Sequence, residues 1–229
     1  MTGIPSDAWL RVFPALRIPE VVSYVSATWQ WLRTTYAEAV TFDQDKPKLT
    51  DNLCEALNDS ERRFSNGMLC DFQPETRELR RNADGTTSYV ARADIRVIFG
   101  APGTPHLVLE FKKLDGSTDS RRLYCFDGLS RFVDGKYAAG HTHGGMCAFV
   151  CVDISSEAVA LATYISDSDR AKRLGCIANA DGNVITMPSI MAPKHAVFDT
   201  LRARAPISSS APIVILHILM PCAGKSFST

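Results

Sequence analysis

The sequence predicts an α/β fold in which a mixed central sheet lies between helices. The middle of the chain is expected to run helix, three strands, helix, strand. Two observations predict this: apolar residues recur with helical spacing up to about residue 66, and from residue 68 they alternate as in strands before helical spacing returns near residue 119. The 229 residues, 45% hydrophobic and 22% charged, are typical of a globular protein, and we expect a single domain over residues 1–229.

Two helices are expected before the sheet. Residues 19–40 place valines, aromatic residues and Leu32 on one broad face. A second helix is expected to begin near Pro47, a residue favoured in the first helical turn, and to end around Asn66-Gly67. Its leucines recur every four positions and give it a stripe facing the core (Leu49, Leu53, Leu57).

Three strands should follow. The first is expected within residues 68–79, and the Asp84-Gly85 dipeptide after it is a hairpin turn signal. Residues 88–99 alternate as a second strand, a short Gly/Pro-rich loop at 100–105 reverses the chain, and residues 106–113 form the third strand.

The second half of the chain is expected to alternate further. The expected elements are a helix at 119–134, an apolar strand at 146–152, a helix at 155–166 capped by Ser155 or Ser156, a hairpin at Asp181-Gly182, a short helix at 195–204 and a buried strand at 212–220.

Charge and cysteine content narrow the class of protein. Twenty-five basic residues balance twenty-five acidic ones. A domain that binds nucleic acid through a large net positive charge is therefore not expected, although a local basic patch can still form. The seven cysteines form an odd set without a C-x-x-C pair, which favours free thiols in a reducing compartment. The chain shows neither a signal peptide nor an apolar run of about 20 residues, so we expect a soluble cytoplasmic protein without a membrane partner.

Two acidic residues are expected to face each other on the second and third strands. Side chains alternate along a strand, so Glu110 and Lys112 share one face of the third strand. The midpoint between Asp94 and Glu110 falls inside the loop at 100–105, and an antiparallel pair about that loop would place their Cβ atoms ~5 Å apart. Like charges so placed are destabilising unless a positive group lies between them. Lys112 is one candidate for that group, and a divalent cation is another.

Two carboxylates with room for water suit Mg²⁺, with Mn²⁺ as a substitute. Such a metal lowers the pKa of a water molecule and neutralises charge that develops on a phosphate. Lys112 would lie beside that water, so the chemistry implied is hydrolysis of a phosphodiester. The alternative interpretation is a solvated hairpin face, since any hairpin can expose a Glu-x-Lys pair.

Asp94 followed by Glu110-Phe111-Lys112 resembles the signature of the PD-(D/E)xK nuclease superfamily, which has the restriction-endonuclease-like fold. The expected element order also resembles its αβββαβ core over about residues 47–152, with an N-terminal helical extension (1–46) and a C-terminal extension with further strands (153–229). The resemblance implies Asp94 and Glu110 as metal ligands, the carbonyl of Phe111 as a third ligand, and Lys112 as the catalytic amine. Residues 128–137 are similar to segments of some prokaryotic defence-type members.

The sequence departs from the family pattern in two places. Ala93 stands where a proline often precedes the first aspartate. Many members also carry an acidic residue on the first core helix, and here four candidates stay open (Asp43, Asp45, Glu55, Glu61).

The resemblance implies a metal-dependent nuclease, with DNA favoured over RNA, endonuclease over exonuclease, and a role in anti-phage defence or restriction. Expected partners are nucleic acid, a helicase or other protein subunit, and a second copy in a homodimer. The alternative is an inactive nuclease-like scaffold or partner-binding subunit of a larger complex, which the neutral net charge favours.

Two other sets of residues are of the types that bind phosphate or metal. Cations of the helix at 119–134 and the residues after it could meet phosphates (Arg121, Arg122, Arg131, Lys136), although charged helix residues are more often a solvated face. His141, His143, Cys147 and Cys151 resemble zinc ligands in type. However, Cys147 and Cys151 would lie ~13 Å apart along a strand, so buried thiols are the favoured interpretation.

Overall fold

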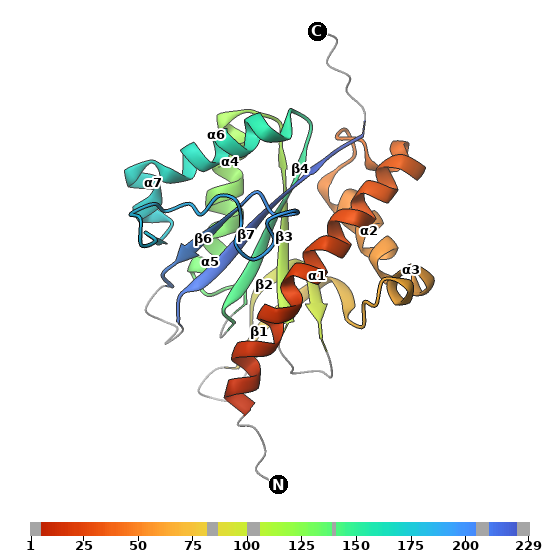
Figure 1. The fold of residues 1–229 in the computed structure, drawn as a ribbon, viewed down its shortest axis with the longest axis horizontal. Helices are drawn as coiled ribbons and strands as arrows, with labels where there is room; N and C mark the ends of the chain where they lie inside the picture. The colour runs from red at the N-terminus through yellow and green to blue at the C-terminus, as the bar shows by residue number, and fades with distance from the viewer. Residues whose placement is uncertain (1–5, 82–86, 100–105, 139–140, 205–210, 224–229) are drawn as a thin grey trace.

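The computed structural model describes residues 6–81, 87–99, 106–138, 141–204 and 211–223 (Figure 1). It is a mixed α/β structure with a seven-stranded sheet in the order β1-β2-β3-β4-β7-β6-β5. The strands are β1 (Asp71–Arg81), β2 (Thr87–Ile98), β3 (His106–Leu114), β4 (His143–Val150), β5 (Cys176–Ile177), β6 (Phe198–Arg202) and β7 (Ile213–Pro221). Neighbouring strands are antiparallel except β3–β4 and β4–β7, which are parallel, so the predicted mixed sheet flanked by helices is confirmed.

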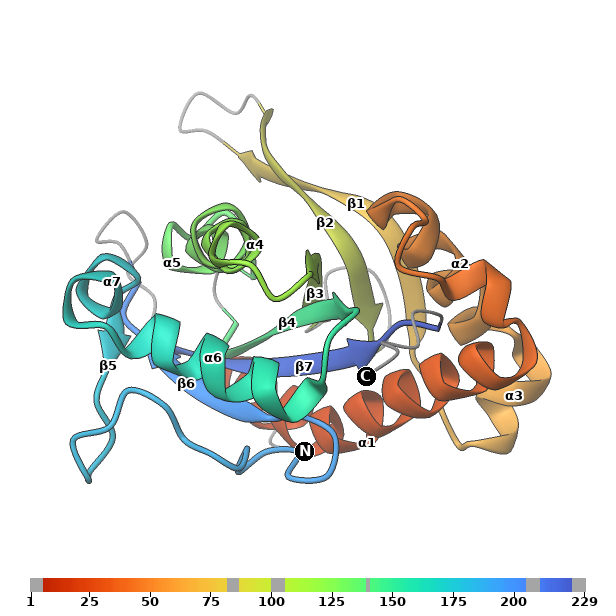
Figure 2. The same ribbon diagram turned by 90° about the horizontal axis from the view of Figure 1, so that it is seen from above.

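Helices cover both faces of the sheet. The α-helices are α1 (Ser6–Thr35), α2 (Lys46–Asn58), α3 (Ser60–Ser65), α4 (Thr118–Leu123), α5 (Ser130–Val133), α6 (Ile154–Ser166) and α7 (Ser168–Arg173). A 3₁₀ turn η1 (Ala37–Val40) follows α1, and a π-helical segment η2 (Tyr124–Leu129) joins α4 to α5. Figure 2 shows α1 and the α4–α5 segment on opposite sides of β4 and β7.

Each face of the sheet has its own hydrophobic core. One core joins α1 and α2 to the sheet, and the other joins η2, α5 and α6 to the opposite face. In β3 the side chains of Leu107, Leu109 and Phe111 enter the first core, while Val108 and Leu114 enter the second. The predicted alternation of β3 is therefore confirmed.

The register between β2 and β3 agrees with the prediction. Ile95 pairs with Leu109 and Ile98 with His106, so that paired residue numbers share the midpoint expected for the loop at 100–105. That loop and the Asp84-Gly85 turn lie outside the described residues. The ladder ends at Ile95 and Leu109, and Figure 2 shows the β1–β2 hairpin continuing away from β3 beyond this point.

Several elements differ from the sequence prediction. The second helix is divided at Asp59, whose side chain accepts a hydrogen bond from the N–H of Arg62 and begins α3. The cap of α6 is Asp153 rather than Ser155 or Ser156, because its carboxylate accepts from the N–H of Ser156. The Asp181-Gly182 segment is a turn in the long connection between β5 and β6, which pair antiparallel, rather than the tip of a tight hairpin.

The predicted helix at 195–204 is wrong. Residues Phe198–Arg202 form β6, which pairs antiparallel with β7. Phe198 and Thr200 favour an extended chain, and the open edge of β7 supplies hydrogen-bond partners that an isolated helix lacks. Within the described residues, no helix is both long enough and apolar enough to cross a membrane.

Candidate functional site

The candidate site begins where β2 leaves β3. Asp94 is the first residue of β2 beyond the ladder with β3, which ends at Ile95. The N–H of Phe111 therefore lacks a backbone partner on β2 and donates instead to Oδ2 of Asp94, at 2.7 Å. Because the N–H and C=O of a strand residue leave the strand on the same side, the carbonyl of Phe111 points toward the same edge. The divergence of two strands thus brings backbone polar groups and a carboxylate together.

Glu110 lies on the neighbouring strand with its side chain almost completely buried, 1% exposed. Its Oε1 is 3.3 Å from Nζ of Lys112 and 3.4 Å from Nη1 of Arg131. Its Oε2 is buried and has no hydrogen-bond partner among the described residues. Burial, and next the negative charge of Asp94, raise the pKa of Glu110 from 4.5 to about 7, against the opposing effect of nearby cations.

Lys46 balances the charge of Asp94. Its Nζ lies 2.6 Å from Oδ1 and 2.7 Å from Oδ2, so one ammonium bridges both carboxylate oxygens. Lys46 is the first residue of α2, and Asp45 before it caps the helix by accepting from the N–H of Lys48 at 2.9 Å. The cation expected near the two carboxylates is therefore not Lys112 alone, because Lys46 and Arg131 contribute as well.

Lys112 is held by the π-helical segment. Its Nζ lies 3.5 Å from Oδ2 of Asp127 as well as 3.3 Å from Glu110. Gly128 allows this approach: a Cβ on Gly128 would meet Cε of Lys112 at 3.1 Å and Cε of Met146 at 2.7 Å. The wider turn of a π-helix, which is frequent at functional sites, lies directly over the lysine stem.

The other helix cations divide between the site and the surface. Arg131 contacts Glu110 and donates a hydrogen bond to the hydroxyl of Tyr137, whose pKa is raised by burial and by the charge of Glu110. Elsewhere, Arg121 pairs with Glu157, Arg122 with Asp119 and Lys136 with Asp134. Of the four predicted cations, the structure brings Arg131 to the carboxylates.

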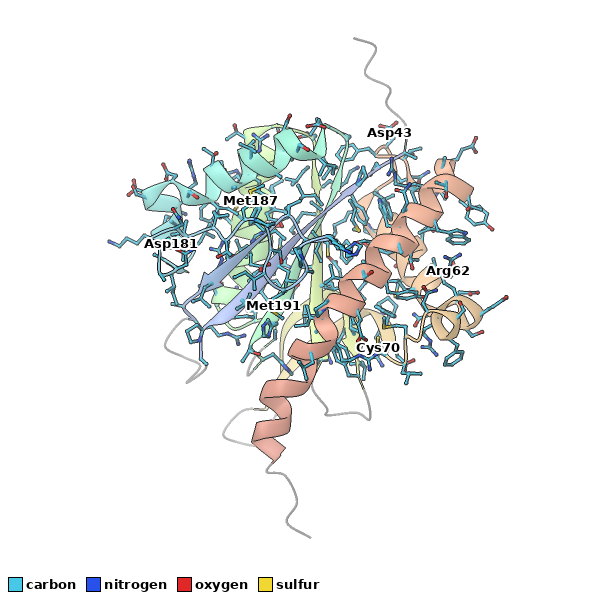
Figure 3. All side chains as sticks on the ribbon, in the orientation of Figure 1. Asp43, Arg62, Cys70, Asp181, Met187 and Met191 are labelled. Carbon is cyan, nitrogen blue, oxygen red and sulfur yellow. The ribbon has the colours of Figure 1, made fainter. Side chains whose placement is uncertain are left out.

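The four acidic candidates on or before the first core helix are spread apart. Asp45 is a helix cap, Glu61 is exposed in the first turn of α3, and Glu55 lines a cavity of about 630 Å³ together with Trp31 and Tyr36. Asp43 lies three residues before Lys46, and Figure 3 shows it near α2, far from Asp181 on the other side of the molecule.

The four residues of zinc-ligand type have other surroundings. Cys147 is buried in the core beneath α1 and α2, and burial raises its pKa well above the usual value. The His141 ring packs on the ring of His106 at 4.1 Å, and His143 contacts the hydroxyl of Thr142. Across the described ranges, no group of three or more His, Cys, Asp or Glu side chains is arranged to hold a metal ion.

The two carboxylates nevertheless fit a hard divalent cation. The buried Oε2 of Glu110 is an oxygen donor without a partner, which is costly in a protein interior. Asp94 presents two further oxygens, both now in contact with the ammonium of Lys46. Carboxylate and carbonyl oxygens are the donors that Mg²⁺ takes, and it keeps several waters besides them, so a site with two carboxylates is sufficient.

Comparisons with protein-family models, with curated proteins and with solved structures found no match for this chain.

Sequence reasoning missed Lys46, Asp127 and Gly128. Lys46 lies 48 residues from Asp94 in the chain, and no pattern in the sequence links the two. For Asp127 and Gly128 a signal existed, since an Asp-Gly pair inside an otherwise helical segment indicates an irregular turn of helix or a close approach of backbone.

Proposed function

We propose that the protein is a metal-dependent nuclease that hydrolyses phosphodiester bonds. The observation that carries the proposal is the convergence of Asp94, Glu110 and Lys112 at the point where β2 and β3 separate, with Oε2 of Glu110 buried and unpartnered. A buried carboxylate with one oxygen unpartnered, beside a second acid, is a costly arrangement for a fold to keep, and a divalent cation would relieve it.

Each residue of the site would have its own role in such a reaction. Asp94 and Glu110 would hold Mg²⁺ or Mn²⁺, with the carbonyl of Phe111 as a further ligand. The metal would lower the pKa of a water molecule and offset charge that develops on the phosphate. Lys112, whose amine lies 3.3 Å from Glu110, would orient the attacking water and stabilise negative charge in the transition state. Asp127 and Gly128 would keep that amine in position.

The order of elements supports a restriction-endonuclease-like core of the PD-(D/E)xK type. Helix α2 is followed by the antiparallel strands β1, β2 and β3, then by α4–α5, and then by β4, which is parallel to β3. On this proposal the substrate is nucleic acid, with DNA favoured over RNA and endonuclease over exonuclease. A role in anti-phage defence follows from the same resemblance.

A second candidate function is a scaffold that no longer cuts and binds a partner protein instead. Two observations favour it: the net charge is zero, and Lys46 already balances Asp94. An enzyme of neutral charge has little electrostatic attraction for DNA at cellular salt, so an active protein would depend on a partner such as a helicase or on a second copy for its grip.

The test is cleavage of labelled single- and double-stranded DNA and RNA with Mg²⁺ or Mn²⁺. We expect wild type to cut, and Lys112→Ala to cut at least ~100-fold more slowly, the usual contribution of a group that assists proton transfer. Lys136→Ala is the matched control, because that lysine is half exposed and pairs with Asp134, and it should cut as wild type does. Undiminished cutting by Lys112→Ala would refute the assignment, and no cutting by wild type would favour the scaffold.

A further inference from the structure

The chain segment that places Lys46 beside Asp94 is anchored by contacts with β3. The segment before α2 is held by Lys113, whose Nζ donates to the carbonyl oxygens of Phe42 and Gln44 and lies 4.3 Å from the centre of the Phe42 ring. Lys113 faces away from Lys112 on β3, so the strand that carries the candidate amine also anchors the segment that carries Lys46. The contact between Lys46 and Asp94 is thus supported by the fold on both sides.

The ammonium of Lys46 takes up the oxygens of Asp94 that a metal would need. It lies within 2.7 Å of both, and the side chains of Lys46 and Asp94 are 28% and 17% exposed. A divalent cation on Asp94 and an ammonium at the same oxygens would repel each other strongly in a partly buried site. One of the two cations therefore has to leave when the other binds.

Lys46 is the cation that can leave. Lys112 and Arg131 contact Glu110, and each has a further partner, in Asp127 and Tyr137. The ammonium of Lys46 contacts the carboxylate of Asp94, and the flexible four-carbon stem of Lys46 begins at the partly exposed first turn of α2. Once displaced, it would be a free ammonium beside the two carboxylates, where a phosphate of the substrate would be its natural counter-ion.

We propose that Lys46 is a displaceable counter-ion that couples metal binding to nucleic-acid binding. Without nucleic acid, it competes with the metal for Asp94. With nucleic acid, it moves to a backbone phosphate and the metal takes its place. This inference rests on the proposed nuclease function. Because coupling between two ligands is reciprocal, nucleic acid raises the affinity for metal by the same factor as metal raises the affinity for nucleic acid.

The first experiment measures Mn²⁺ binding by calorimetry without nucleic acid. Lys46→Met keeps the stem and removes the charge, and we expect it to bind Mn²⁺ about 10-fold more tightly than wild type, within the usual range of coupling between sites. Lys48→Met is the matched control. Lys48 is exposed and lies two residues further along α2, and its substitution removes the same charge from the protein. It should bind Mn²⁺ as wild type does.

The first arm of the second experiment needs no substitution at Lys46, so it tests the inference even if Lys46→Met folds poorly. In the Lys112→Ala protein, where cutting is expected to be at least ~100-fold slower, Mn²⁺ is titrated with and without a short DNA duplex. We expect the duplex to raise the Mn²⁺ affinity about 10-fold. Adding Lys46→Met to this protein should abolish that effect.

The outcomes separate the two proposals. Equal or weaker Mn²⁺ binding by folded Lys46→Met, or no effect of the duplex, would overturn the role of Lys46 and leave the nuclease proposal in place, since metal would still bind. An absence of Mn²⁺ binding in wild type and in Lys46→Met alike would overturn both.

Discussion

The site is built from opposite charges that come from separate elements. Glu110 on β3 lies beside Asp94 on β2, and burial alone would make two neighbouring carboxylates unfavourable. Lys46 from α2 and Arg131 from α5 reduce that cost, one on each acid. The pKa of Glu110 nevertheless stays raised, to about 7, so the balance is incomplete. This incomplete balance is what the proposed binding of a divalent cation would relieve.

Gly128 gives a direct test of how Lys112 is positioned. We expect Gly128→Ala to push aside Cε of Lys112, 3.1 Å from the new Cβ, and Cε of Met146, 2.7 Å from it. Overpacking of this kind costs about 1–3 kcal/mol, partly offset by about 1 kcal/mol of better helix propensity, so urea unfolding should show a small loss. A displaced catalytic group can cost about 100-fold in rate, so cutting should fall far more than stability.

A second measurement on Gly128→Ala distinguishes positioning from general damage. The three atoms nearest the new methyl belong to Met146 and Lys112, not to Asp94 or Glu110, so Mn²⁺ affinity should stay at the wild-type value. Cutting at the wild-type rate would show that Gly128 does not hold the amine in place.

The proximity of Asp94 and Glu110 could be predicted from the sequence, whereas the cations around them could not. The period of two along β3 and the midpoint of a short loop were enough to place Asp94 near Glu110, because antiparallel register follows from local sequence. Lys46 reaches Asp94 only through the packing of α2 against the sheet, 48 residues away. Such a contact depends on the whole tertiary structure, so no local pattern indicates it.

Among the elements, α2 has two tasks. Its leucines pack into the core below the sheet, and its first residue supplies the ammonium at Asp94. The start of the helix must therefore be fixed, and the Asp45 cap fixes it. Asp45 therefore has a structural role as a helix cap, although it is one of the four acids that the sequence offers as a possible metal ligand.

Substitution of Asp45 separates capping from metal binding. Asp45→Asn should keep the cap, since Asn caps as well as Asp, and should leave both stability and Mn²⁺ binding unchanged. Asp45→Ala should lose about 1 kcal/mol in urea unfolding because the N–H of Lys48 loses its partner. Asp51→Ala, an exposed acid on the same helix, is the control and should be neutral. Loss of Mn²⁺ binding in Asp45→Asn would identify Asp45 as a ligand instead.

Other elements show why boundaries were less predictable than types. Residues 195–204 carry apolar spacing that fits a short helix, and only the free edge of β7 makes the extended form better. Residues 119–134 are helical as expected, but they include a π-helical segment at 124–129, in which Gly128 lies against Lys112 and Met146. Competition between such alternatives is decided by neighbours that are distant in sequence.

At the scale of the whole molecule, the site lies where the sheet changes character. β3 is antiparallel to β2 on one side and parallel to β4 on the other, and the site opens at the end of the β2–β3 ladder. Another contact joins the sheet to helix α1: Nε1 of Trp29 on α1 donates to the carbonyl of Pro221 at the end of β7, at 2.7 Å. A rigid body with one strand pair that separates can hold two acids close at a fixed distance.

The titration of buried groups sets the pH range in which the whole fold is stable. Burial lowers the pKa of three histidines, His141 (to about 4), His143 and His217. Their contribution is present above pH ~6.5, the unfolded value, and is lost as the pH falls. Glu110, with its pKa raised from 4.5 to about 7, acts in the opposite direction: its contribution is present below pH ~4.5 and is lost as the pH rises through about 7.

Glu110→Gln should therefore change the shape of the pH–stability curve. In EDTA, we expect the ionisation of Glu110 in the interior to offset, between pH ~4.5 and ~7, part of the rise in the free energy of unfolding that the three histidines give, and the wild-type curve to level above pH ~7. In Glu110→Gln that offset is absent, and its advantage over wild type should grow by about 3 kcal/mol between pH ~4.5 and ~7. Urea unfolding at intervals of one pH unit measures both curves. Glu55→Gln, an exposed acid, should run parallel to wild type, and a parallel curve for Glu110→Gln would mean that Glu110 is ionised throughout.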